Sequence, residues 1–153
     1  MYQITMNSPV GFLTLKADEN YLTSITFGPS EVNQIETNIL MKTKRQLEEY
    51  FSNDRISFDV PMNLVGTTFQ KEVWNALMTI PYGETCSYQD IAIKMNKPNA
   101  VRAVGQANRK NPYPIIIPCH RVIGKNSKLV GYAGNQIDKK EYLLNHESCL
   151  VED

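Results

Sequence analysis

The spacing of apolar residues changes near residue 28, and this change limits the folds that the chain can adopt. Before it, apolar and polar residues alternate in three runs, 2–6, 12–15 and 22–27, which is the period of half-buried strands. Turn-forming residues such as Asn7-Ser8-Pro9 separate the runs. After Ser30, apolar residues recur at helical spacing instead. The sequence therefore predicts an α+β protein that begins with a three-stranded antiparallel sheet.

One or two amphipathic helices are expected to cover one face of this sheet. Ser30 can cap the first helix, because a serine hydroxyl accepts a hydrogen bond from the first turn. The apolar residues at helical spacing are Ile35, Ile39, Leu40, Leu47, Tyr50 and Phe51. A short strand around 56–60 is expected to end at Pro61. We place the domain boundary after this strand, which gives an N-terminal structural domain, 1–63, and a C-terminal domain, 64–153.

Three helices are predicted between the boundary and position 119. Thr67 or Thr68 caps the first, whose apolar stripe comprises Phe69, Val73, Trp74, Leu77 and Met78. Ser87 caps the second, and the third covers about 99–108. Two short helices joined by a tight turn, the second of them basic, are typical of a helix-turn-helix. Small residues make that second helix slim, which suits either a DNA groove or close helix packing. They are Ala100, Ala103, Gly105 and Ala107.

Charge is distributed unevenly although the net charge is zero. Residues 1–60 contain five Lys/Arg and eight Asp/Glu, whereas residues 87–128 contain eight Lys/Arg and one Asp. Such a basic block is the electrostatic footprint of phosphate binding, and the alternative is a solvated surface. No apolar run is long enough to span a bilayer, and no export signal is evident. We therefore expect a cytoplasmic protein that does not bind membranes.

Cys119 is the strongest candidate for chemistry. The three cysteines, Cys86, Cys119 and Cys149, form no CxxC motif, so we expect reduced thiols, no metal and no cofactor. Cys119 follows the apolar run 115–118 and precedes His120. Burial there would raise the pKa of the thiol unless a base or a dipole holds the thiolate, so Cys119 is either a core residue or an assisted nucleophile. If this segment is extended, the side chains of Cys119 and His120 point in opposite directions, which counts against direct assistance of the thiol by the imidazole.

The run 111–123, NPYPIIIPCHRVI, resembles the acceptor-cysteine signature of the O6-alkylguanine-DNA alkyltransferases. The runs 68–88, TFQKEVWNALMTIPYGETCSY, and 101–105, VRAVG, resemble further blocks of that family in the same order. The resemblance implies a ribonuclease H-like N-terminal domain and a C-terminal helical domain with a winged-type helix-turn-helix. It also implies direct-reversal DNA repair, in which the alkyl group of O6-alkylguanine, and of O4-alkylthymine, is transferred irreversibly and once to Cys119.

The resemblance assigns roles to four other residues around the sulfur. His120 would accept the thiol proton through a water, and Glu147 would hold His120. Asn111 would tie the helix-turn-helix to the cysteine loop, and Tyr88 would donate a proton or hydrogen bond to the departing guanine. Relative to the family, one extra residue lies between Tyr132 and Tyr142. The alignment that matches Glu147 to the glutamate of the family is shifted by this residue.

The partner implied is double-stranded DNA, bound by a monomer with the second helix of the motif in the minor groove. Arg102 would insert into the base stack where the damaged nucleotide leaves. The other DNA-binding residues implied are Tyr88, Ala100, Val101, Ala103 and Gly105. The residues implied for the base pocket are Asn108, Val122, Tyr132 and Ala133. An alternative is a helix-turn-helix DNA-binding protein or regulator that senses alkylation damage without repair.

Overall fold

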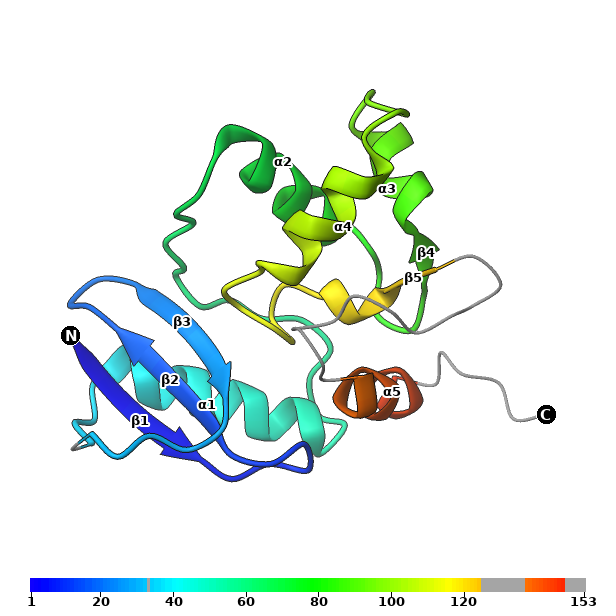
Figure 1. Ribbon diagram of the computed structural model, residues 1–153. Helices are drawn as coiled ribbons and strands as arrows, with labels where there is room; N and C mark the ends of the chain where they lie inside the picture. Colours follow the sequence, from blue (N-terminus) through cyan, green and yellow to red (C-terminus); the bar gives the residue numbers. More distant parts are fainter. Residues whose placement is uncertain (33, 125–136, 148–153) are drawn as a thin grey trace. The chain divides into compact units, whose positions relative to one another are not determined.

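The computed structural model describes residues 1–32, 34–124 and 137–147, which form two compact units, Met1–Leu64 and Val65–Asp153 (Figure 1). The first unit is a sheet with a helix, and the second is mainly helical. The predicted α+β class is therefore confirmed. None of the described helices has both the length and the apolar character that crossing a bilayer requires.

The sheet of the first unit has the predicted strands, β1 (Tyr2–Met6), β2 (Leu13–Ala17) and β3 (Leu22–Phe27), paired antiparallel in that order. The register aligns Ile4 with Leu15 and Leu15 with Ile25, so side chains of the same parity share one face. Helix α1 (Asn38–Phe51) packs against β1 and β2 (Figure 1). Its fully buried apolar residues are Leu40, Leu47 and Tyr50.

Helix α1 begins later than predicted, and Ser30 does not cap it. Thr37 is the N-cap, and its hydroxyl accepts a hydrogen bond from the backbone N–H of Leu40. The Ser30 hydroxyl instead accepts a hydrogen bond from the side chain of Gln3 at 2.6 Å. Ile35, which was assigned to the apolar stripe, precedes the helix and is 49% exposed.

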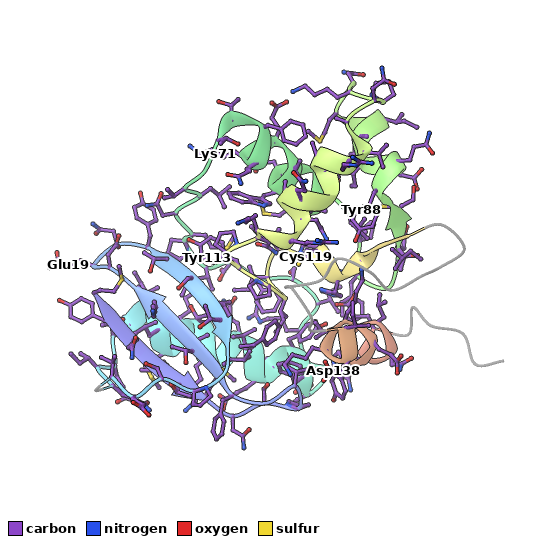
Figure 2. All side chains as sticks on the ribbon, viewed as in Figure 1. Glu19, Lys71, Tyr88, Tyr113, Cys119 and Asp138 are labelled. Carbon is purple, nitrogen blue, oxygen red and sulfur yellow. The ribbon has the colours of Figure 1, made fainter. Side chains whose placement is uncertain are left out.

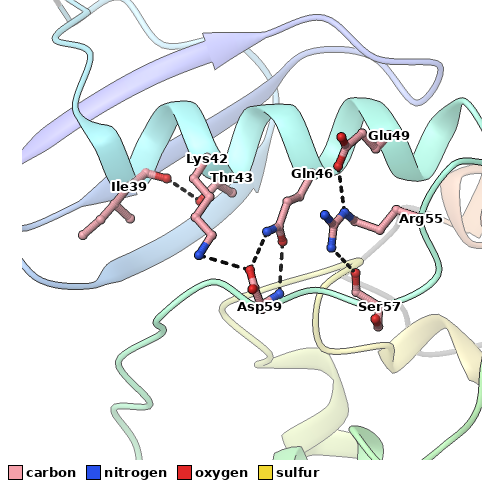
Figure 3. Close-up of polar contacts among 8 residues, drawn as sticks. All are labelled: Ile39, Lys42, Thr43, Gln46, Glu49, Arg55, Ser57 and Asp59. Carbon is pink, nitrogen blue, oxygen red and sulfur yellow. Dashed lines mark hydrogen bonds and ion pairs between the residues drawn. The ribbon is translucent and has the colours of Figure 1, made fainter.

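The strand predicted at 56–60 is absent, because a side chain of α1 takes the bonds that a neighbouring strand would have made. The amide of Gln46 donates to the Asp59 carboxylate at 2.6 Å and accepts from the Asp59 backbone N–H at 3.1 Å (Figure 3). Lys42 adds an ion pair to the same carboxylate at 3.1 Å. The alternating sequence at 56–60 is therefore held by α1 in an irregular conformation.

The helices of the second unit begin at the predicted caps. Helix α2 (Thr68–Leu77) starts with a capping box at Thr67, and α3 (Tyr88–Lys94) starts with one at Ser87. Helix α4 (Val101–Arg109) follows a short turn, so α3 and α4 form the predicted helix-turn-helix and both contact α2. Met78 is the C-cap of α2 and is 40% exposed, so it is not part of the buried stripe.

The cysteine lies in a short 3₁₀ helix, η1 (Cys119–Arg121), between these helices and α5 (Ile137–His146). Strand β5 (Val122–Ile123) follows η1 and pairs in parallel with β4 (Cys86–Ser87), which leads directly into α3. This pairing connects η1, which we call the cysteine turn, to the start of the helix-turn-helix.

Helix α5 is buried along one face. Tyr142 lies off this face, because it is 38% exposed and stacks on His146. The buried positions are Lys140, Leu143, Leu144 and, just after the helix, Glu147. These positions are related by steps of three and four residues, which places them on one face of a helix. A lysine thus occupies a position that helical spacing shares with two core leucines.

We expect Trp74→Phe to lower the free energy of unfolding by about 1–3 kcal/mol, because the smaller ring leaves a cavity and the Ala107 carbonyl loses one of its two hydrogen bonds, keeping the one from the Lys110 N–H. The Trp74 indole is 2% exposed and donates to the Ala107 carbonyl at 2.9 Å, which joins α2 to α4. Urea unfolding measures the change. Val65→Ala, at a site that is 72% exposed, is the control and should change stability by less than about 0.5 kcal/mol. An equally small effect of Trp74→Phe would contradict this account.

Candidate active site

The cysteine turn presents a buried thiol (Figure 2). Cys119 is 2% exposed, and the preceding residues 115–117 are also buried. The segment is a turn of 3₁₀ helix, and not extended, because the Arg121 N–H donates to the Pro118 carbonyl at 3.0 Å. Ile115 has φ of 77°, an unfavourable value for a β-branched residue, so the approach to the cysteine carries backbone strain. The expectation that Cys119 and His120 diverge as on a strand therefore does not apply.

A buried carboxylate orients the histidine. His120 Nε2 lies 2.7 Å from Glu147 Oε2, and both side chains are fully buried. Arg121 contacts the same carboxylate through Nε to Oε1 at 2.7 Å and through Nη2 to Oε2 at 3.1 Å. Arg121 Nη1 also donates to the Ile80 carbonyl at 2.7 Å. Glu147 is therefore shared between an imidazole and a guanidinium that is itself fixed to the end of α2.

Burial keeps both the thiol and the imidazole in their neutral forms. Burial raises the pKa of the Cys119 thiol to about 11, while a hydrogen bond from Asn111 and the positive charge of Lys140 act in the opposite direction. Burial lowers the pKa of His120, against the attraction of Glu147, so the imidazole is neutral at pH 7. A neutral imidazole next to an un-ionised thiol can accept its proton.

Two asparagines connect α4 to the cysteine turn. Asn111 Nδ2 donates to the Ile117 carbonyl at 2.8 Å, and its Oδ1 accepts from the Tyr113 N–H at 2.9 Å. Asn108 is 1% exposed, and its Nδ2 lies 3.4 Å from the Cys119 carbonyl. These contacts fix the backbone on both sides of the sulfur relative to the end of α4.

Tyr88 lies at the start of α3, on the side of the site that is formed by the helix-turn-helix (Figure 2). Burial, and next the charge of the Cys119 thiolate, raise the pKa of its phenol to about 12, so Tyr88 remains a hydrogen-bond donor at neutral pH. A hollow of about 380 Å³ is lined by Ser87, Tyr88, Gln89 and Val101. Two of the predicted DNA-binding residues therefore border one recess.

Helix α4 has an exposed face of small and basic residues. Arg102 and Ala103 are exposed, Val101 and Gly105 are partly exposed, and Ala100 is the N-cap. Ala107, by contrast, is buried and packs inside the unit. The small residues thus serve two purposes, with packing at Ala107 and an open surface around Ala103.

The remaining pocket residues are placed only in part. Val122 is fully buried in β5, while Tyr132 and Ala133 lie outside the described residues. The residue that sequence reasoning missed is Lys140, which is fully buried and donates to the Val122 carbonyl at 2.6 Å. Its spacing from Leu143, Leu144 and Glu147 was the signal that could have revealed it.

Both units match models of one protein family. Residues 1–64 match the ribonuclease-like domain of 6-O-methylguanine DNA methyltransferase, and residues 68–149 match its DNA-binding domain. The chain belongs to the O6-methylguanine-DNA methyltransferase family. The predicted family is therefore confirmed.

Relatives and solved structures agree with this assignment over nearly the whole chain. The constitutive methylated-DNA–protein-cysteine methyltransferase of Bacillus subtilis is 45% identical over 95% of this chain and 94% of its own length. That of Methanosarcina acetivorans is 46% identical over 97% and 100%. The crystal structure of Mycobacterium tuberculosis OGT in complex with DNA superimposes with a TM-score of 0.87 at 43% identity, covering 96% of this chain and 92% of that one. The alternative of a regulator without repair activity is not favoured by these relatives.

We expect Arg121→Met to lower the free energy of unfolding by about 3–5 kcal/mol, because it removes one partner of a buried ion pair and leaves the Glu147 carboxylate under-compensated. The matched control is Arg55→Met. Arg55 contacts Glu49 at a similar 2.9 Å (Figure 3), but the two side chains are 28% and 38% exposed, so its loss should cost about 0–1 kcal/mol. Denaturant unfolding of both variants compares the two pairs. Equal losses would show that burial of the Glu147 pair has no energetic consequence.

Proposed function

We propose that this chain repairs alkylated DNA by transferring the alkyl group of O6-alkylguanine, and of O4-alkylthymine, irreversibly to Cys119. The observation that supports this most directly is a buried thiol on the same turn as a neutral His120. Nε2 of this imidazole contacts the Glu147 carboxylate. This arrangement of nucleophile, base and orienting carboxylate is the one that hydrolases use to activate a weak nucleophile. Here it would activate sulfur toward an alkyl carbon.

The proton moves before or during the attack. It leaves Cys119 Sγ and reaches His120 through a bridging water, and the imidazolium that forms is stabilised by Glu147, 2.7 Å from Nε2. Glu147 does not need to accept the proton itself, because Arg121 balances its charge. The amide of Asn111 lowers the pKa of the thiol and so favours the thiolate.

The transfer forms a bond from sulfur to the alkyl carbon and breaks the bond from that carbon to guanine O6. The electron pair of the broken bond goes to the guanine, which must take up a proton or a hydrogen bond to be a good leaving group. Tyr88 supplies this donor, since its phenol remains protonated. The products are intact guanine and a thioether on Cys119. A thioether has no comparable leaving group, so the protein reacts once.

DNA is bound through α4 in the minor groove, and the damaged nucleotide is rotated out of the stack. Unstacking and unpairing cost roughly a few kcal/mol, and Arg102, exposed on α4, offsets part of this by occupying the gap. Ala100, Val101, Ala103 and Gly105 allow the helix to approach the groove closely. Asn108, Val122, Tyr132 and Ala133 would line the space that receives the base. We place this activity in the cytoplasm, which keeps Cys119 reduced, and assign it to a monomer.

A limit of one alkyl group per molecule is the first test. When the protein is incubated with an excess of O6-methylguanine duplex, methyl transfer should stop at about one equivalent, because nothing regenerates the thiol. Mass spectrometry should find a single added methyl group on Cys119. Cys119→Ala should transfer none, whereas Cys86→Ala, which removes another free thiol, should behave as the parent. Continued turnover, or methylation elsewhere, would exclude this mechanism.

Arg102→Ala separates base rotation from chemistry. We expect transfer from duplex DNA to slow by about tenfold or more, because the unstacking cost is no longer offset, while transfer from a free O6-alkylguanine base changes little. Arg102→Lys keeps the charge and distinguishes phosphate attraction from insertion into the stack. Single-turnover rates on the two substrates provide the comparison. A similar loss on duplex and free base would remove Arg102 from base rotation.

A further inference from the structure

We propose that Asn108 is a specificity-determining residue, whose side-chain carbonyl oxygen accepts a hydrogen bond from the exocyclic 2-amino group of the guanine that is repaired. The inference rests on the function proposed above and deepens it, because it concerns the base that would enter the site. It gives Asn108 a role in the choice between substrates, beyond a place in the lining of the pocket.

The side chain of Asn108 contacts both the cysteine turn and the phenol of the site. It lies in the last turn of α4, next to Ala107, whose carbonyl accepts from the Trp74 indole and fixes this turn to α2. Asn108 Nδ2 donates to the Cys119 carbonyl at 3.4 Å. Burial raises the pKa of the Tyr88 phenol to about 12, and a hydrogen bond from the Asn108 side chain acts in the opposite direction. The amide is therefore adjacent to both residues that the proposed transfer needs.

The other polar atom of this amide, Oδ1, is buried and has no hydrogen-bond partner in the part of the chain that the structure describes, 1–32, 34–124 and 137–147. A buried acceptor without a partner is destabilising and is rare in folded proteins. Exchanging the two atoms of the amide would not satisfy it, because Oδ1 would then face the Cys119 carbonyl oxygen, and two acceptors cannot bond. A donor that arrives with the substrate would complete the amide.

An O6-alkylated guanine offers one N–H donor group for this purpose. Alkylation of O6 leaves ring nitrogen N1 without a proton, N9 carries the sugar, and N3 and N7 are acceptors, so the 2-amino group remains. The carbon that bears this group lies between N1 and N3, the two acceptors of the six-membered ring. A phenol that donates to either nitrogen is therefore next to the amine. Tyr88 and Asn108 are neighbours in the same way, one as donor and the other as acceptor.

This hydrogen bond would distinguish substrates that carry the same alkyl group. O4-alkylthymine has no N–H group, and O6-methylhypoxanthine is O6-methylguanine without the 2-amino group. Either base would leave Oδ1 buried and without a partner, whereas O6-methylguanine satisfies it. A site that hydrogen-bonds a group of its substrate selects against an analogue that lacks this group. O6-methylguanine is therefore the preferred substrate of the three.

The test compares single-turnover methyl transfer from two single-stranded oligonucleotides, one with O6-methylguanine and one with O6-methylhypoxanthine. Single strands are used because no base pair then has to be broken. We expect the parent to prefer O6-methylguanine by about tenfold, and Asn108→Leu to lose this preference through slower reaction with O6-methylguanine. Leucine is close to asparagine in size and leaves little room for a water in place of Oδ1. Gln106→Leu, at an exposed position of α4, is the control and should keep the preference.

A role limited to holding the cysteine turn through Nδ2 predicts a different result, because its loss would slow both substrates by the same factor. An unchanged preference in Asn108→Leu would therefore overturn the proposal, and so would equal rates on the two substrates in the parent. If Asn108→Leu does not fold, as judged by circular dichroism, Asn108→Ala is measured in its place.

Transfer from an O6-methylguanine duplex, measured on the parent alone, tests the proposed function separately. A parent that transfers no methyl group from the duplex refutes that function and this inference together. A parent that repairs the duplex but reacts equally with the two single strands refutes this inference alone.

Discussion

The reactive sulfur must be enclosed and yet able to ionise, and these two requirements conflict. Enclosure excludes water from the place where an alkyl carbon would be attacked, but it also raises the pKa of the Cys119 thiol to about 11. Three groups from different segments of the second unit lie around the sulfur. They are the amide of Asn111 after α4, the ammonium of Lys140 on α5 and the imidazole of His120 on the cysteine turn. The amide and the ammonium lower the pKa of the thiol, and the imidazole is the proposed acceptor of its proton.

Glu147 connects this arrangement to the fold. A buried carboxylate is tolerated only when it is paired and hydrogen-bonded, and the partners here come from η1, which is itself anchored by Arg121 to the end of α2. One carboxylate thus fixes the ring of His120, the proposed base, and joins α2, η1 and the end of α5. Loss of a partner would disturb the chemistry and the packing together, which explains why a charged network is retained where apolar residues would also fill the space.

Much of the fold could be predicted from local signals, because caps and periodicity act over a few residues. The three strands and the capping boxes at Thr67 and Ser87 are of this kind. The strand expected at 56–60 does not form, because the side chain of Gln46, 13 positions before Asp59, takes the hydrogen bonds of Asp59. Lys140 was missed because lysine is ordinarily a surface residue, and the contact that justifies its burial is with Val122, 18 positions away. The pairing of His120 with Glu147 spans 27 positions. Only the resemblance to a family indicated it.

The small residues of α4 are not all explained by packing within the unit. A glycine inside a helix costs about 1 kcal/mol relative to alanine, so a fold alone favours alanine unless space is short. At Gly105 space is not short, because an added Cβ would lie 3.9 Å from its nearest neighbours, two atoms of the Tyr88 ring, which is an ordinary contact. Ala103, two residues earlier, is exposed and has no need to be small for packing. Packing within the unit therefore does not explain the stability given up at Gly105, whereas the proposed approach of DNA to the backbone of α4 would.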